Sequence, residues 1–428
     1  MIRKIGFAII CLFATGMYAQ DGSVSPYSYF GLGELRSGST AENQMMGGIG
    51  MYADSIHVNL KNPAAYGGLG IQGRDDFGIT TYTAGLSYKQ TSLKSYTESQ
   101  TTAVTNLDYL SIGLSIKKGL GIGFGIIPYS SVGYNFEDLV GTEGSQEINQ
   151  YSGDGGVNKV YMSVGYEFAK DFSIGVTANY NFGRIETLKV QSNEGILLGS
   201  KDERVSRING VDFNYALSYS PAIDDTHTLV TSVRINTQAN LTARNTQRIG
   251  SFIGSPTQER FVNEVDLAAQ GREDTGITIP TTTTLGIGYG KDMQWFLGVE
   301  YSFQKLTDFS NDFLEIDNLV YKDASTLALG GFYTPERNSF GSYFKRVTYR
   351  AGVRLEKTGM YVNEKDINNF GITFGLGLPL GNNLSNLNLG FEVGKKGTTA
   401  ADLIEESYFK VNLGLSLSDQ WFRKRKIN

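Results

Sequence analysis

The stretch YFKVNLGLSLS, residues 408–418, alternates between apolar side chains and small or polar ones. Successive side chains of an extended strand point to opposite faces. The two faces are Phe409, Val411, Leu413, Leu415 and Leu417 against Lys410, Asn412, Gly414 and Ser416. A strand of a soluble sandwich also has one buried face, but it normally turns charges toward water. A small, polar second face with few Lys or Glu is typical of a transmembrane β-barrel, whose apolar side chains face lipid.

Segments with the same period of two recur almost everywhere after residue 76. A first strand near Phe77–Tyr88 is ambiguous, because Phe77 and Ile79 have the opposite phase to Tyr82 and Leu86. This segment, residues 408–418 and twelve further segments make fourteen predicted strands. The apolar faces of the twelve lie in 110–116, 120–126, 160–168, 172–182, 211–219, 229–241, 285–289, 297–303, 327–333, 347–355, 370–378 and 387–393.

The connections between these segments alternate in length. If the last strand ends in the periplasm, long loops must face outward and short turns inward. The expected outward loops are 89–106, 136–156, 184–207, 244–280, 304–324, 357–368 and 395–406. The expected inward turns are 117–119, 169–171, 221–228, 291–294, 334–346 and 381–386, of which only 334–346 is long. The sequence therefore predicts an all-β fold, a 14-stranded antiparallel transmembrane β-barrel over residues 77–418.

Composition agrees with a barrel and excludes several other classes. The 428 residues include 53 Gly and only 8 Pro, 12% are aromatic and 19% are charged. Mean hydropathy is −0.21, and no segment after the N-terminal signal offers eighteen consecutive apolar residues, which excludes a helical membrane protein. The chain has no glycine triplet period, heptad or long charge block, so it is not collagen, a coiled coil or a disordered tail.

The N-terminus predicts export. Arg3 and Lys4 precede the apolar run IGFAIICLFATGM, and a signal peptide over residues 1–19 is favoured over a signal anchor because the run is short. The only cysteine, Cys11, lies inside that run, so the mature chain can form no disulfide and no thiolate metal site. Cleavage leaves 36 basic residues against 43 acidic ones, and this mildly acidic balance argues against a nucleic-acid partner.

Residues 20–76 lack strand-length alternation. A fourteen-stranded barrel is too wide for its own side chains to fill. We therefore expect this segment to form an N-terminal plug (hatch) in the lumen, with a small periplasmic domain as the alternative. At the other end, residues 419–428 are predicted to be a basic periplasmic tail, so both termini are expected to be periplasmic or luminal in a protein integral to the bacterial outer membrane.

The chain resembles the FadL/TodX-type outer-membrane transporters of long-chain fatty acids and other hydrophobic compounds. The resemblance rests on the signal, the plug motif Asn62-Pro63-Ala64, the strand count and the length. It is most similar to the Bacteroidota branch through SPYSYFGLGEL (25–35), GIIPYSSVGYNF (125–136), GDGGVNKVYMSVGY (153–166), GLGLPLG (375–381), LNLGFEVGKKGT (387–398) and WFRKRK (421–426).

The resemblance implies a barrel with an N-terminal hatch that takes up apolar molecules passively through a gap in its wall. The same branch also includes accessory barrels of larger machines, such as a secretion system or the barrel-assembly apparatus. The resemblance does not separate these two roles.

Enzymatic chemistry finds little support in the sequence, and we predict neither a catalytic site nor a cofactor. The mature chain has two histidines. His57 in the plug is interpreted as a packing or hydrogen-bonding residue, and His227 in an inward turn as a solvated one. Two isolated histidines and no cysteine argue against a zinc or copper site. The acidic loop 304–324 misses the spacing of a Ca²⁺ loop.

Charged residues on the inward phase are candidates for ligand contact. Most of them are expected to pair across the lumen or with the plug. The alternative is that Arg350 or Arg354 receives the carboxylate head group of a ligand. The whole set is Glu167, Arg234, Glu300, Arg350, Arg354, Glu392 and Lys410.

Pro128 is the one proline that falls in the middle of a predicted strand, Leu120–Tyr134. Proline donates no hydrogen bond to a neighbouring strand, so the strand must bulge or part from its neighbour there. Counting phase places Ile127 and Tyr129 on the lumen side, just after Gly125, where other strands carry small or polar residues. We predict a lateral opening at Pro128 lined by Ile127 and Tyr129. A kink in the third strand is also what the resemblance implies, and a rim bulge without a transport role is the alternative.

Two classes of function remain open. The first is passive uptake of a hydrophobic small molecule, like a long-chain fatty acid, and the second is a non-transporting accessory subunit of an outer-membrane machine. A simple porin is a weaker third option, because the plug should block an open pore. The expected partners are outer-membrane lipid and lipopolysaccharide, a hydrophobic small molecule, and other outer-membrane or secreted proteins.

Overall fold

The computed structural model describes residues 22–70, 78–142, 146–313, 319–339, 341–381 and 384–420. The predicted signal peptide, 1–19, and residues 421–428 of the predicted tail lie outside these ranges. Asp419 and Gln420, which the sequence assigned to the tail, belong to the last strand.

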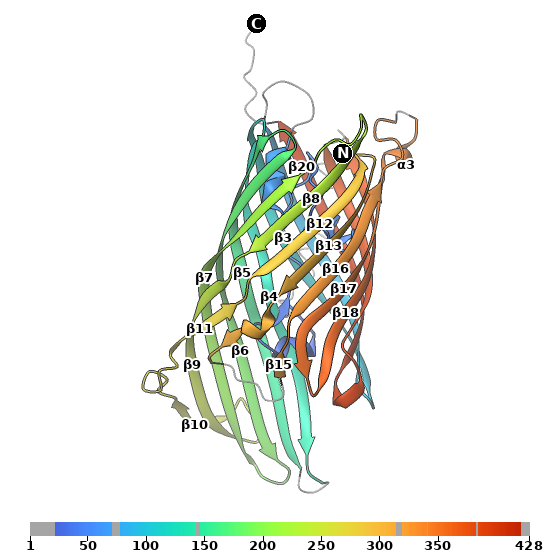
Figure 1. Ribbon diagram of the computed structural model, residues 1–428. Coiled ribbons are helices and arrows are strands. Elements are labelled where there is room, and N and C mark those ends of the chain that lie inside the picture. The colour runs from blue at the N-terminus through green and yellow to red at the C-terminus, as the bar shows by residue number, and fades with distance from the viewer. Residues whose placement is uncertain are drawn as a thin grey trace.

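The described chain forms a closed antiparallel barrel of fourteen strands, as predicted (Figure 1). Ten positions of the barrel are single strands, and four are interrupted and carry two or more labels. The strands are β2 (Ile79–Lys94), β3 (Ser99–Lys117), β4 (Leu120–Val140), β5 (Glu147–Ala169), β6 (Phe172–Asn193), β7 (Leu198–Tyr219), β8 (His227–Asn236) with β9 (Ala239–Ile253), β10 (Glu259–Glu264) and β11 (Asp274–Ile279) with β12 (Thr282–Lys291), β13 (Trp295–Gln304) with β14 (Ser310–Asn311), β15 (Leu319–Tyr321) with β16 (Ala324–Tyr333), β17 (Thr348–Val362), β18 (Lys365–Leu380), β19 (Ser385–Lys396) and β20 (Glu405–Gln420).

Pairing of the first and last strands closes the barrel. The register of β2 with β20 runs from Ile79 opposite Gln420 to Lys94 opposite Glu405. It also resolves the ambiguous phase of the first strand. Tyr82 lies opposite Leu417, which is 43% exposed on the outer surface, so the Tyr82 and Leu86 phase faces outward.

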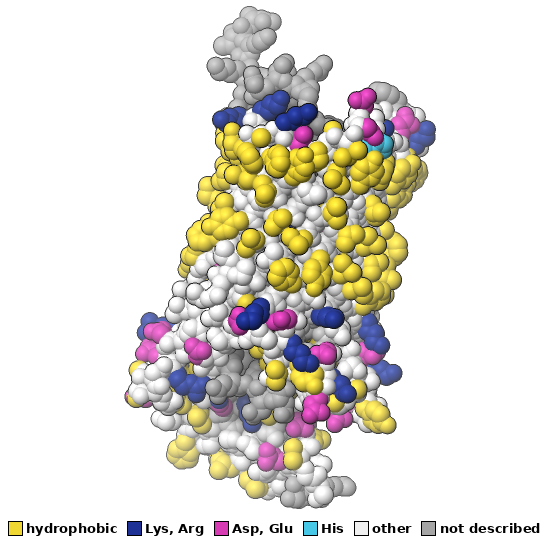
Figure 2. Space-filling view, viewed as in Figure 1, with side chains coloured by type: hydrophobic (Ala, Val, Ile, Leu, Met, Phe, Trp, Pro, Cys, Tyr) yellow, Lys and Arg dark blue, Asp and Glu magenta, His cyan; other side chains and the backbone are white. Residues whose placement is uncertain are grey.

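A belt of apolar side chains crosses the face shown in Figure 2, and exposed apolar residues continue it on strands around the barrel. Many are large and substantially exposed, for example Ile287, Leu297 and Phe374, each at 56%. Exposed apolar patches of this extent do not persist on soluble monomers, and they match the lipid-facing band of a membrane barrel. Among the described residues, no helix is both long and apolar enough to cross a membrane.

Several connections that the sequence predicted as long outward loops are largely strand. Residues 89–106 contain only a short turn between β2 and β3, and most of 136–156 and 184–207 belongs to β4–β7. β5 has 23 residues and β6 has 22, whereas crossing a membrane takes about 9–11. Beyond the belt the apolar residues change to the inner face, as Val157 and Ile185 do, so the outward alternation ends although backbone pairing continues, and the hairpins project as long ribbons (Figure 1).

The plug, described over residues 22–70, lies inside the barrel (Figure 1). It contains η1 (Pro26–Tyr29), β1 (Glu34–Leu35), α2 (Ala41–Gln44) and η2 (Pro63–Gly68). Its close contact with the wall depends on glycines, which have no side chain. A Cβ added at Gly352 would lie 2.2 Å from the backbone nitrogen of Gly47, and one at Gly175 would lie 2.2 Å from the carbonyl carbon of Pro63. The plug backbone therefore lies directly on glycine patches of the wall.

Candidate functional site: a seam in the barrel wall

β3 and β4 pair only in their first halves, counted from the turn that joins them. Pairing ends at Leu110 opposite Ile126. Beyond that point residues 99–109 of β3 pair with β2 alone, and within the described residues β4 pairs on its other side with β5 up to Val140. We call the interval between β3 and β4 beyond Leu110 and Ile126 the seam.

Pro128 lies two residues beyond the last β3–β4 pair. It has no N–H to donate, which removes one bond that could have continued the pairing. The β4–β5 register shifts between Pro128 and Ser130, so Tyr129 is a bulged residue. The bulge lies opposite Asn158 and Val157 of β5, and the next residue of β5, Gly156, has a φ of +152° that suits glycine. The local backbone thus bends at the position that the sequence singled out.

Residues of the plug occupy the seam. β1 pairs antiparallel with β4, Glu34 opposite Ser131 and Leu35 opposite Ser130. The backbone N–H of Arg36 then donates to the carbonyl oxygen of Tyr129 at 2.9 Å. The side chain of Leu35 is 60% exposed. β1 therefore supplies part of the backbone hydrogen bonding to β4 that β3 does not provide beyond Ile126.

Ion pairs hold the same plug segment to the opposite edge of the seam. Arg36 contacts Asp108 of β3 at 2.7 Å, and Lys89 of β2 contacts Glu34 at 2.8 Å. Ser23 donates to the second oxygen of Glu34 at 2.6 Å. Burial would raise the pKa of Glu34, but Lys89 and Lys396 outweigh it and hold the pKa well below its usual range. Glu34 is therefore ionised, and the seam is closed electrostatically on this edge.

The predicted lining residues lie around the start of the seam. Ile127 is 9% exposed and packs in a cluster with Val58, Tyr66 and Leu69 of the plug. Tyr129 packs at the edge of a second cluster that contains Leu32, and the Lys159 ammonium lies 4.1 Å from its ring centroid.

Gly125 lies one residue before the last β3–β4 pair. A Cβ there would lie 2.3 Å from the carbonyl oxygen of Leu110, so a close strand approach requires glycine. The two strands are thus held tightly together immediately before they separate.

The two arginines proposed as head-group contacts already have partners. Arg354 lies 2.6 Å from Glu392 in the lumen. Arg350 donates to Asn388 at 3.0 Å, and Asn388 donates to Glu42 of α2 at 2.6 Å. Both arginines thus belong to networks within the wall or between wall and plug.

The plug motif caps a short helix. The side chain of Asn62 accepts from the N–H of Ala64 at 3.1 Å and donates to Ser218 of β7 at 3.2 Å. Pro63 follows as the first residue of η2, a position in which its missing N–H costs nothing. The motif therefore fixes both the start of η2 and its contact with the wall.

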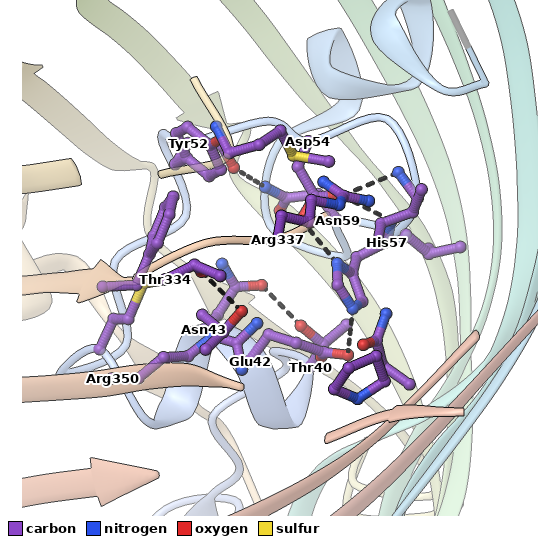
Figure 3. A pocket seen from close by; sticks show the side chains of 18 of the residues that line it. Thr40, Glu42, Asn43, Tyr52, Asp54, His57, Asn59, Thr334, Arg337 and Arg350 are labelled. Atoms are coloured by element: carbon purple, nitrogen blue, oxygen red, sulfur yellow. Dashed lines mark hydrogen bonds and ion pairs between the residues drawn. The ribbon is translucent and has the colours of Figure 1, made fainter. Parts of the chain in front are cut away.

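A small pocket lies between plug and wall, with a volume of about 60 Å³ (Figure 3). Its plug side carries His57, whose Nδ1 lies 2.6 Å from Asp54 and whose Nε2 lies 3.5 Å from Glu42. Arg350 and Thr334 come from the wall. Burial alone would lower the pKa of His57, but Asp54 and Glu42 together raise it above 6.5. His57 therefore has the hydrogen-bonding role that was predicted for it.

Sequence reasoning missed the four charged residues that hold the seam, Glu34, Arg36, Lys89 and Asp108. One signal was present in LDYL, residues 107–110, where Asp108 interrupts an otherwise apolar run. It marks a bulge, because the β2–β3 register shifts there. The partner of Asp108 is 72 residues away in the chain, a distance that no local pattern reveals.

A family model described as BamG matches residues 1–428. No curated protein matches the chain. Among solved structures, a toluene transporter TodX from P. putida is similar with a TM-score of 0.58 and 14% identity, over 91% of this chain and 100% of that one. The monoaromatic hydrocarbon channel CymD follows with a TM-score of 0.56 and 13% identity, over 91% and 99%. The toluene transporter TbuX of Ralstonia pickettii has a TM-score of 0.56 and 14% identity, over 89% and 98%. At these identities the likeness establishes the fold.

Proposed function

Because the chain belongs to the BamG family, we propose that it works as an accessory barrel of a barrel-assembly complex in the bacterial outer membrane. The branch that the sequence resembles includes accessory barrels of such a complex, and one structural observation supports a role without transport. The plug is built into the wall, since β1 pairs with β4 across the seam and Arg36 and Glu34 hold it to β3 and β2. Such a barrel is a closed scaffold.

The lumen supports the same proposal. The side chains of Arg350 and Arg354, which would otherwise be free to receive an anionic head group, contact Asn388 and Glu392. A cluster of buried apolar residues also fills the space around Leu32 of the plug, with side chains from β4, β5, β6, β7, β9 and β11. Binding of partners then falls to the exterior, above all to the long hairpins that project beyond the belt.

Affinity purification of the full chain under mild detergent tests this proposal. We expect other envelope proteins to co-purify at about one copy each, and to be lost when the projecting part of the β4–β5 hairpin is replaced by a tight turn. The matched control shortens the β17–β18 hairpin, which turns at Asn363 and Glu364. Recovery of a lone barrel from both intact cells and mildly solubilised membranes would contradict an accessory role.

A second candidate is passive uptake of a hydrophobic small molecule, such as a fatty acid, through the seam. It is supported by the loss of β3–β4 pairing beyond Ile126 and by the aromatic-hydrocarbon channels that share the fold. The wall would open at Pro128, with Ile127 and Tyr129 lining the path and Gly125 marking its inner limit. In this role β1 is the gate, and Arg350 or Arg354 would exchange a protein partner for the ligand carboxylate.

A further inference from the structure

Three arginines lie side by side on the outer wall. Arg184 of β6 is directly opposite Arg207 of β7, and Arg207 is directly opposite Arg244 of β9. All three are exposed. Directly opposed side chains of neighbouring strands are about 5 Å apart at Cβ, and like charges at that distance destabilise the sheet. The fold therefore maintains an unfavourable arrangement at this place.

Carboxylates pair with the two outer arginines of this row but not with the middle one, Arg207. Arg184 contacts Glu186 at 2.5 Å, and Arg244 contacts Glu273 at 3.1 Å and lies opposite Asp274. Within the described residues, no ion pair includes Arg207. Asp154 lies opposite Glu186, one row farther from the belt. The acidic groups thus lie on the side of the arginine row that faces away from the belt, and at the end of the row next to β11.

A groove of about 600 Å³ opens beside Arg184 and Arg207 on the outer wall. Among the described residues that line it, these two arginines alone are charged, and none is a carboxylate. Gly156 lies between Ser131 and Arg184 in the same row and contributes no side chain. The described lining of the groove thus offers two cations and no competing carboxylate.

The groove lies at the edge of the apolar belt. Two residues below the arginines, the next outward row is Pro128, Asn158, Phe182 and Asn209. The row after that is Ile126, Val160, Tyr180 and Val211, of which the last three are 46–52% exposed. Charged side chains begin where the belt ends (Figure 2). Lipid head groups lie at this level of a membrane barrel, and the acyl chains lie below it.

We propose that this groove binds a phosphorylated glycolipid of the outer leaflet. Its phosphate lies between Arg184 and Arg207, whose guanidinium groups suit bidentate contact with phosphate oxygens. Its first acyl segment lies on Phe182 and Tyr180. A lipid fits better than an acidic protein segment, because the cations and the apolar surface follow one another along the membrane normal. The proposal does not rest on either proposed function, since lipid binding to the outer wall requires neither a partner protein nor an open seam.

Native mass spectrometry of the delipidated barrel in mild detergent tests the proposal, with diphosphoryl lipid A as the probe. We expect saturable binding to the wild type. The affinity should fall roughly tenfold in Arg207→Gln and by about a further tenfold in the double variant Arg184→Gln/Arg207→Gln. Lys357→Gln is the matched control. Lys357 is also exposed and lies two residues beyond the apolar Leu355, but its cross-strand neighbours are the uncharged Ser325 and Asn368.

Two further probes need only the wild-type barrel. Lipid A without phosphates should bind at least tenfold more weakly, and inorganic phosphate should not displace the diphosphoryl form at millimolar concentration. Unchanged affinity in the double variant, with folding confirmed by heat-modifiable migration in gels, would overturn the proposal. Equal binding of the dephosphorylated lipid would overturn it as well, and so would capture of an acidic envelope protein in place of the lipid.

Discussion

A guanidinium nitrogen of Arg36 lies 2.7 Å from a carboxylate oxygen of Asp108, which ties the plug to β3 where β3 has separated from β4. Ser87 of β2 donates to the same oxygen at 3.0 Å. The two edges of the seam are thus held differently. Backbone hydrogen bonds join β1 to β4, whereas side chains alone join it to β2 and β3. The β3 edge is therefore the one that can release without breaking a sheet.

Replacing Arg36 with Ala should loosen the plug at the seam. It leaves Asp108, which is 9% exposed, without its cation, at a cost of about 2 kcal/mol. Hydrogen exchange over residues 22–36 should accelerate accordingly. Lys305→Ala is the control, because Lys305 and Asp308 form a pair that is 69% and 54% exposed and contributes little. Equal exchange in both variants would mean that the ion pair does not hold the seam.

Pro128→Val restores a backbone donor two residues beyond the last β3–β4 pair. If the seam conducts hydrophobic molecules, longer pairing should slow uptake of a fluorescent fatty acid by a factor of several while the barrel stays folded. Pro379→Val is the control, because Pro379 lies near the end of β18, where pairing with β19 is intact. Uptake that is absent in the wild type, or unaltered by Pro128→Val, would favour the accessory role.

Gly352→Ala should displace the plug. The added methyl would lie 2.2 Å from the backbone nitrogen of Gly47, and backbone cannot move aside as a flexible side chain can. We expect a loss of about 1–3 kcal/mol in plug docking, read as faster proteolysis within residues 22–70. Gly68→Ala is the control within the plug itself, because nothing lies within 4 Å of its added Cβ. Similar proteolysis of the two variants would show that close contact at Gly352 is dispensable.

The pocket around His57 predicts a pH dependence. Asp54 and Glu42 favour the charged imidazolium and raise its pKa in the folded state above 6.5, despite burial. The folded state therefore binds the proton more tightly than the unfolded state, and this stabilisation is complete below about pH 6.5. It is lost as the pH rises through the folded pKa.

The difference in unfolding free energy between the wild type and His57→Gln isolates this contribution and should shrink over that pH range. Comparison with His57→Gln is needed because Lys61 changes the stability with pH in the opposite direction. Burial lowers the pKa of Lys61 to about 8, so its charged form destabilises the plug below that pH and the penalty fades as the pH rises toward 10.5. A difference that stays constant with pH would exclude a titrating role for His57.

The membrane-facing part of the barrel was predictable because lipid imposes a strict alternation, as in residues 408–418. The same reasoning failed for the projecting hairpins, where β5 and β6 continue as strands but their apolar residues change from the outer to the inner face. The lateral opening predicted at Pro128 stays a prediction, but this proline lies two residues beyond the last β3–β4 pair, at the start of the seam. Closure of the seam was not predictable, since the contact of Arg36 with Asp108 depends on the path of a plug that has no repeating pattern.

Enclosure of the plug also constrains how the chain reaches its final form. The barrel closes when β20, at the end of the chain, pairs with β2. We expect α2 to be in place by then, because Thr373 of β18 donates to Met45, directly after α2, and Asn388 of β19 donates to Glu42. Once β2 and β20 have paired, wall surrounds the circumference of the plug. We therefore expect folding of residues 22–70 and insertion of the last strands to be coupled, and a variant that delays the plug should accumulate as an open, unfinished sheet.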